Sequence, residues 1–311
     1  MSDHSSSLHS INGDLKLNSA QTLGYMIVNA ANLFIPRNGI DKNLVISNFF
    51  IKDLESYWGK IGKISSPARM LTDLFWISLD WQRIKMELGE INLLDIGCGK
   101  GGNIRRLFSF TKGMLDSYVG IDIKEGPRWS ELKEEFAFAR FYKETGNDLS
   151  GFLSDNVNVI ISQSVMEHVP SDLDYFKDLA DFVNQSSKAV IQFHLIPSEA
   201  CLLTYLKHGI RQYSPRLISK ITSLFGPNSQ CSLVKLGGNQ CNLLHWKTIT
   251  YPSLIKKQDG LRKLNPERYN ELAMDSIKKD MFKVSRFPAF YALIICSNVK
   301  TKNATEYFCQ R

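Results

Sequence analysis

Residues 93–103, with the sequence LLDIGCGKGGN, constrain this chain more than any other segment. An apolar run ends in a glycine-rich turn, and a helix-like stretch follows over 104–110. A second apolar run, 118–121, then ends in Asp122. A strand, a tight glycine loop, a helix and a second strand ending in an acid are typical of α/β folds that bind an adenosine-containing cofactor. Glycine allows backbone to contact a ligand, and a carboxylate can accept hydrogen bonds from both ribose hydroxyls.

Two classes of cofactor fit this loop. Gly97, Gly99 and Gly102 satisfy the G-x-G-x-x-G spacing of dinucleotide-binding folds, which is a weak signal by itself. Asp95 argues against a dinucleotide, because the strand before the first glycine is usually apolar in those folds. The loop also lies far from the start of the chain. A third apolar run, 159–165, leads into the sequence MEHV and predicts another strand followed by a loop and a helix.

With these features the chain resembles the class I S-adenosylmethionine-dependent methyltransferases. The first motif of that family has the form acid-x-Gly-x-Gly-x-Gly, which Asp95, Gly97, Gly99 and Gly101 match. The acid at the end of the second strand matches Asp122, and 166–169 match the segment after the fourth strand. The resemblance implies a Rossmann-like α/β fold with a mostly parallel seven-stranded sheet and helices on both faces. It implies S-adenosylmethionine as the cofactor, with a nicotinamide dinucleotide as the alternative.

The resemblance also implies which residues hold the methyl donor. The loop from Gly97 through Cys98 and Gly99 to Gly101 would run along its amino-acid part, and Asp95 would serve the loop and the ammonium end. Asp122 would accept hydrogen bonds from the ribose, and Ile123 would pack on the adenine.

Other donor contacts follow the third and fourth strands. Asp148, beside Asn147, matches the adenine contact of the family, although an acid at such a turn is also a common N-cap. Gln163 and Ser164 complete the expected set.

Histidines are the best candidates for removing a proton from an acceptor hydroxyl. His168 lies near the end of a predicted strand, beside the expected donor methyl. Because Glu-His-Val recurs in family members with different acceptors, a structural role is an equal alternative. His194 is a second catalytic candidate, on strand-end position alone. His208 and Tyr213 fall in a segment expected to cap the pocket.

Composition fits a globular protein and excludes several classes. Hydrophobic residues make up 43% of the 311 residues, and the formal net charge is +7. We expect neither a signal peptide nor a membrane span, and therefore a cytoplasmic location with peripheral membrane contact left open. The six cysteines show no C-x-x-C pair, and no metal-ligand spacing is recognisable, so no metal is predicted. No basic patch interleaved with aromatic residues indicates a nucleic-acid surface.

The chain divides into three predicted parts. Residues 1–15 are Ser-rich and expected to be disordered, 16–88 form a helical preface, and 89–311 form the α/β domain with helical cap insertions near 197–226 and 253–284. Predicted strands lie at 92–96, 118–122, 139–143, 157–162, 188–195, 231–236, 241–250 and 287–297.

The acceptor is expected to be a small molecule. Segments 194–198 and 207–213 resemble methyltransferases encoded with polysaccharide biosynthesis enzymes, which implies a sugar hydroxyl on a nucleotide- or lipid-linked intermediate. Arg211, Arg216 and Lys220 would then bind phosphates, or else form the solvated face of a helix. An RNA or protein methyltransferase is the alternative within the same fold.

Overall fold

The computed structural model describes residues 4–34, 39–144, 149–301 and 304–308. Its centre is an eight-stranded sheet in the order β1-β7-β8-β6-β5-β2-β3-β4. β8 pairs antiparallel with β6 and β7, and the other pairings of the described sheet are parallel. The strands are β1 (Val45–Asn48), β2 (Asn92–Ile96), β3 (Ser117–Asp122), β4 (Ala139–Lys143), β5 (Val159–Gln163), β6 (Val190–Pro197), β7 (Ser229–Leu236) and β8 (Phe290–Ser297). The predicted Rossmann-like, mostly parallel sheet is thus confirmed, with one more strand than expected.

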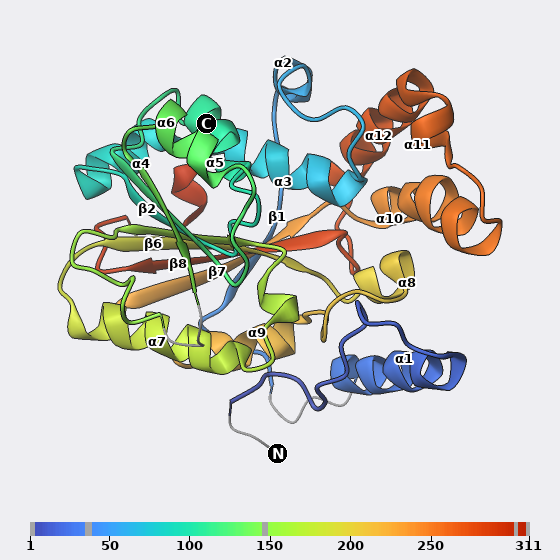
Figure 1. The fold of residues 1–311 in the computed structure, drawn as a ribbon, viewed down its shortest axis with the longest axis horizontal. Coiled ribbons are helices and arrows are strands. Elements are labelled where there is room, and N and C mark those ends of the chain that lie inside the picture. The colour runs from blue at the N-terminus through green and yellow to red at the C-terminus, as the bar shows by residue number, and fades with distance from the viewer. Residues whose placement is uncertain (1–3, 35–38, 145–148, 302–303, 309–311) are drawn as a thin grey trace.

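Helices cover both faces of the sheet (Figure 1). Apolar side chains on one face pack against α3 (Pro67–Ser78), α4 (Trp81–Leu88), α5 (Asn103–Phe110) and α6 (Trp129–Glu135). Those on the other face pack against α1 (Ser19–Phe34), α7 (Asp172–Gln185) and α9 (Pro215–Thr222). Alternate residues of one strand enter different cores, as Leu93 and Leu94 do. Burial on both sides explains why the central strands are continuous apolar runs.

A group of helices gathers beyond one end of the sheet (Figure 1). It comprises α8 (Cys201–Tyr205), α10 (Asn239–His245), the π-helix Trp246–Ile255, α11 (Leu261–Leu264) and α12 (Pro266–Met281). The short helix α2 (Leu54–Trp58) contacts α3 instead. Several helices begin where the sequence dictates: Ser66, Ser214 and Asn265 each accept a hydrogen bond from a backbone N–H of the first turn, and a proline follows each of them. None of the described helices is both long enough and apolar enough to cross a lipid bilayer.

Three segments differ from the sequence-based expectations. The strand predicted at 241–250 is wrong, because this apolar stretch forms α10 and the start of the π-helix and packs against α12. Within the expected helical preface, Val45–Asn48 forms β1, which extends the sheet beyond β7. The described part of the Ser-rich N-terminus is held against the domain: Ser6 is buried, and its N–H donates to Asp172 at 2.8 Å.

Candidate active site

The glycine loop follows β2 and is fixed to β3. The backbone N–H groups of Gly97 and Cys98 both donate to the carbonyl of Ile121, at 2.8 and 3.0 Å. Gly97, Gly99 and Gly101 have φ angles of +72°, +56° and +78°, in the left-handed region that favours glycine. The motif therefore uses glycine at these positions because the backbone requires it.

The three glycines have different surroundings. A Cβ at Gly97 would overlap the side chain of Val165, and one at Gly101 would overlap Leu132. A Cβ at Gly99 would meet no atom within 4 Å. Packing therefore requires the first and third glycines, whereas the second borders open space in which a ligand can approach the backbone.

Asp122 ends β3 beside this space. Its Oδ2 accepts a hydrogen bond from the backbone N–H of Gly99 at 2.8 Å, and its Oδ1 accepts one from the N–H of Lys124 at 3.0 Å. Ile123, the next residue, is 66% exposed, which leaves its side chain free to cover a flat ligand. The indole of Trp129 also holds the loop, because its Nε1–H donates to the carbonyl of Gly99 at 2.9 Å.

Asp95 is a buried acid with one unpaired oxygen. Its Oδ2 accepts hydrogen bonds from the Tyr118 hydroxyl at 2.5 Å and from Asn103 Nδ2 at 3.2 Å. Its Oδ1 has no partner among the described residues. Burial raises the pKa of Asp95 to about 7, although the hydrogen bonds from Tyr118 and Asn103 act to lower that pKa. An acid with a spare oxygen beside the loop suits a cationic group of a ligand.

The other predicted donor contacts are Cys98, Gln163, Ser164, Asn147 and Asp148. The thiol of Cys98 is buried, and burial raises its pKa well above the ordinary value, so it stays protonated. Gln163 is held by α3, since it accepts from Trp76 Nε1 at 2.9 Å and donates to Thr72 at 3.0 Å. Ser164 has a φ of +55°, and its N–H donates to the carbonyl of Leu195 at 2.9 Å. Asn147 and Asp148 lie outside the described residues.

His194 lies in the interior of the sheet. It is fully buried, with Nδ1 2.8 Å from the Ser162 hydroxyl and Nε2 3.1 Å from Gln192 Oε1. Burial lowers the pKa of His194 to about 3, so the imidazole is neutral near pH 7. With both ring nitrogens bonded to the core, these contacts favour a structural role.

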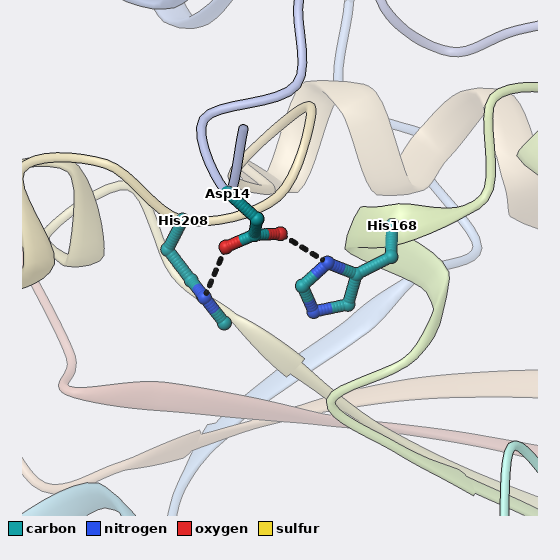
Figure 2. Close-up of side chains that lie close together, drawn as sticks. All are labelled: Asp14, His168 and His208. Carbon is teal, nitrogen blue, oxygen red and sulfur yellow. Dashed lines mark ion pairs between the residues drawn. The ribbon is translucent and has the colours of Figure 1, made fainter. Parts of the chain in front are cut away.

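His168 belongs to a group of four ionisable side chains that we call the His168 cluster: Asp14, Glu167, His168 and His208 (Figure 2 shows three of them). The two oxygens of Asp14 face one imidazole each, 2.8 Å from His168 Nδ1 and 3.5 Å from His208 Nδ1. On the other side, Glu167 Oε1 lies 3.4 Å from His208 Nε2 and 3.8 Å from His168 Nε2.

Burial and charge set the properties of this cluster. Glu167 is fully buried, and neither of its oxygens receives a regular hydrogen bond from a described residue. Burial acts to lower the pKa of His208, but the carboxylates of Glu167 and Asp14 outweigh it and leave that pKa above its ordinary value. Asp14, His168 and His208 present ligand atoms that all lie within 4.8 Å of one another, and such a set can hold a metal ion.

The cluster lies beside the glycine loop. β2 and β5 are neighbours, with Ile96 opposite Ser162, so their carboxyl ends reach the same edge of the sheet. Val165, which packs on Gly97, comes just before the 3₁₀ turn Met166–His168. A ligand bound over the glycine loop would therefore lie beside the His168 cluster.

Arg211 stabilises the 3₁₀ turn Met166–His168 and the residues after it through hydrogen bonds. Its guanidinium is fully buried and donates to the carbonyls of Met166, Val169 and Pro170, at 3.1, 2.5 and 2.9 Å. The expected phosphate contact and the expected solvated face are both wrong for Arg211, because its donors are used inside the protein. Tyr213 is buried as well and donates to Asp172 at 2.9 Å.

An apolar cavity of about 830 Å³ lies between α1, α8 and α10. Its lining includes Met26, Ile27, Leu203, Leu243 and Trp246, and among the described residues that line it Glu199 is the one ionisable side chain. Leu206, close along the chain to His208, also belongs to the wall. The cavity is of a size and character that suit an apolar ligand.

Comparisons with known proteins point in one direction. A family model described as a methyltransferase domain matches residues 76–236, about half of the chain. No curated protein matches. Similar solved structures include the plantazolicin methyltransferase BamL, with 15% identity, a TM-score of 0.42, and coverage of 79% of this chain and 87% of that one. They also include a SAM-dependent methyltransferase from Archaeoglobus fulgidus, with 17% identity, a TM-score of 0.40 and coverage of 70% and 90%. A third is a geranyl diphosphate C-methyltransferase from Streptomyces coelicolor, with 16% identity, a TM-score of 0.39 and coverage of 70% and 78%. These structural likenesses are too weak to bear on the acceptor.

Proposed function

Because this chain belongs to the methyltransferase-domain family, we propose that it transfers a methyl group from S-adenosylmethionine to a sugar hydroxyl of a small molecule used in polysaccharide biosynthesis. Membership of the family confirms two predictions from the glycine loop, the class of enzyme and S-adenosylmethionine as its cofactor. The family match does not identify the acceptor, so the proposed acceptor depends on the residues that line the site of this protein.

One observation carries the placement of the donor: the space over Gly99 is open, with Asp122 hydrogen-bonded to the Gly99 N–H and the buried Asp95 on the strand that leads into the loop. Asp122 has a fixed, partly exposed carboxylate that suits the ribose hydroxyls. Asp95 is buried with a free oxygen that suits the ammonium group. The glycine loop between them would lie along the amino-acid part, where the absence of a side chain at Gly99 admits the ligand.

The reaction is an in-line displacement at a sulfonium methyl. The donor supplies the activation when bound, so the protein must position the acceptor oxygen, exclude water and assist loss of the hydroxyl proton. His168 is the proposed catalytic residue, because the cluster that contains it flanks the loop at the shared edge of β2 and β5. His194 is left out of the catalytic group, since both its nitrogens are engaged in the core.

The apolar cavity favours a lipid-linked sugar over a nucleotide-linked one. The described residues of its lining offer little to a nucleotide, because their side chains are mostly aliphatic or aromatic and the ionisable one among them, Glu199, is an acid. An isoprenoid or acyl chain would bury apolar surface there, at a gain of about 25 cal/mol per Å². With α8 and Leu206 in its wall, the cavity would place the sugar end of such an acceptor toward His208.

Calorimetric titration with S-adenosylhomocysteine tests the donor site, with NAD as the control ligand. We expect binding of S-adenosylhomocysteine alone, and binding of NAD alone would overturn the proposal. Incubation with the donor and a panel of lipid-linked and nucleotide-linked sugars then tests the acceptor by mass spectrometry. A methylated nucleotide sugar with no methylated lipid-linked product would reject the lipid-linked assignment.

His168→Ala tests the catalytic assignment. We expect turnover to be lost while S-adenosylhomocysteine binds with unchanged affinity, because the residue lies on the acceptor side of the loop. Loss of both would instead indicate that His168 supports the fold of the site.

A further inference from the structure

We propose that Asp14, His168 and His208 form a binding site for a divalent first-row transition metal. The inference rests on the proposed function and deepens it, because the metal would bind and activate the acceptor oxygen. Two independent observations support it: the convergence of three ligand atoms, and the position of a buried acid behind both imidazoles.

The first observation is geometric. One ring nitrogen of His168, one of His208 and one carboxylate oxygen of Asp14 all lie within 4.8 Å of one another, and both imidazoles turn Nδ1 toward the Asp14 carboxylate (Figure 2). In a tetrahedral zinc site with bonds of about 2.0–2.1 Å, ligand atoms are separated by roughly 3.3 Å. His168 Nδ1 lies 2.8 Å from Oδ2 of Asp14, and His208 Nδ1 lies 3.5 Å from Oδ1 of the same carboxylate. Both distances are close to that value, so side-chain movements that bring the two nitrogens to one oxygen would admit an ion.

The second observation is the role left for Glu167. Histidines that bind a metal almost always donate their other ring N–H to a carboxylate or a carbonyl, which fixes the tautomer and the ring orientation. Glu167 is fully buried and lacks regular hydrogen bonds, yet it lies 3.4 Å from His208 Nε2 and 3.8 Å from His168 Nε2. One acid thus lies near the Nε2 atoms of both imidazoles, while each Nδ1 faces Asp14 and would exchange its proton for the metal ion.

The metal site specifies how His168 would assist loss of the acceptor proton. Its Nδ1 faces Asp14 at 2.8 Å, so His168 would act as a ligand of the metal that binds the acceptor hydroxyl. Three protein ligands would leave a metal with an open position for that hydroxyl, as in catalytic rather than structural sites. Two nitrogen ligands and one oxygen ligand favour zinc, iron or a similar ion over magnesium or calcium.

The chemistry balances with the family's methyl donor. The acceptor hydroxyl would bind at the open position, and the metal would lower its pKa so that the proton passes to water. The oxygen then attacks the sulfonium methyl carbon, forming an O–C bond. The C–S bond breaks, its electron pair stays on sulfur, and neutral S-adenosylhomocysteine leaves with the methylated acceptor.

The test begins with the full chain and zinc alone. The protein is treated with a chelator, dialysed and titrated calorimetrically with Zn²⁺, and its metal content as purified is measured by mass spectrometry. We expect one ion per chain. His168→Gln and His208→Gln should abolish measurable binding, and Glu167→Gln should weaken it about 10–100-fold. His4→Gln is the matched control, because His4 lies on the same N-terminal segment and pairs with Asp174 outside the cluster.

Binding of Co²⁺ gives a readout that does not depend on activity. A metal held by the two imidazoles should give visible d–d absorption in the wild type and in His4→Gln, and none in His208→Gln. Thermal melting of each variant separates loss of the ligand from loss of the fold.

Titration of the same samples with S-adenosylhomocysteine separates the two proposals. Donor binding without zinc binding would overturn the metal site and leave the proposed function standing. Zinc binding that is equal in the wild type and in a His168→Gln, His208→Gln double variant would also overturn it. If the wild-type protein does not bind S-adenosylhomocysteine, the proposed function is contradicted instead.

Discussion

The Asp122 carboxylate accepts a hydrogen bond from the backbone N–H of Gly99 at 2.8 Å, across 23 residues of sequence. The acid proposed to hold the ribose therefore also fixes the centre of the loop along which the donor lies. Removal of this carboxylate should weaken donor binding in two ways: the ribose loses a hydrogen-bond acceptor, and the loop loses the bond that fixes Gly99.

Asp122→Ala should weaken the binding of S-adenosylhomocysteine by about 10–100-fold, which corresponds to about 1–3 kcal/mol for lost hydrogen bonds. Calorimetric titration measures the change in Kd. Asp181→Ala, which changes an exposed acid of α7, serves as the control. Unchanged affinity in a folded Asp122→Ala protein would remove Asp122 from the donor site.

Substitutions at Gly97 and Gly99 should separate folding from binding. Gly99→Val should abolish donor binding, because a Cβ there enters the open space, while the backbone strain of a branched residue costs about 1–3 kcal/mol of stability. Gly97→Ala should lower the melting temperature more, since its methyl overlaps Val165. Melting curves and donor titrations of both variants check this order. Donor binding retained in Gly99→Val would contradict the proposed position of the ligand.

The ionisation of Asp95 should make stability depend on pH. Its pKa is about 7 in the folded protein and near 3.8 when exposed, so the folded state holds the proton more tightly. The stabilisation is complete below about pH 4 and is lost as the pH rises through 7, with an upper limit of about 4 kcal/mol at 1.36 kcal/mol per pKa unit. Asp95→Asn should remove this slope between pH 4 and 8 in denaturant unfolding. A variant with the same slope as the wild type would show that Asp95 does not titrate in this range.

The same protonation should couple to donor binding. If the ammonium group of the donor pairs with Asp95, binding near pH 6 must release the proton that the acid holds in the free protein. Titrations in buffers of different ionisation enthalpy measure the number of protons released. We expect a value approaching one at pH 6, falling toward zero at pH 8 and absent from Asp95→Asn.

His194→Ala should be a stability variant. It removes the hydrogen bond to Ser162 and leaves a cavity in the core, so we expect a loss of about 2–4 kcal/mol in the free energy of unfolding. Donor affinity of the folded protein should not change. The low pKa of the wild-type His194, about 3, means that its contribution is present above pH 6.5 and is lost as the pH falls toward 3. Normal stability with abolished turnover would restore the catalytic role.

The central strands could be predicted because both of their faces are buried, which favours apolar residues at successive positions. The central strand Asn92–Ile96 has the predicted boundaries. So does Ala139–Lys143, although it is an edge strand with alternating burial. The stretch from Cys241 to Thr250 was misassigned because its apolar residues fit a short buried strand as well as a helix. In the folded protein α10 packs against α12, and this tertiary contact favours the helix over the strand. β1 has only four residues and a weak apolar pattern, so packing at the sheet edge defines it.

The donor site was more predictable than the acceptor site for a physical reason. Gly97, Gly99 and Gly101 are constrained by local backbone geometry, which a short motif records. The His168 cluster is assembled from segments far apart in the sequence. The sequence indicates His168 and His208 separately, but it gives no sign of Asp14, because the Ser-rich stretch carries no periodic pattern. Arg211 was misjudged because a basic residue is usually exposed, and its three carbonyl acceptors appear only in the folded chain.

The N-terminal segment has a consequence for how the enzyme can be damaged or handled. Asp14 reaches the cluster from an N-terminal segment without helix or strand, which is held by hydrogen bonds such as that from Gly13 N–H to the Gly209 carbonyl at 2.7 Å. A protease that clips the chain after this point would leave the glycine loop, Asp95 and Asp122 intact. The trimmed protein would still sequester the methyl donor but would no longer turn it over, so a preparation with full ligand-binding capacity can be catalytically dead.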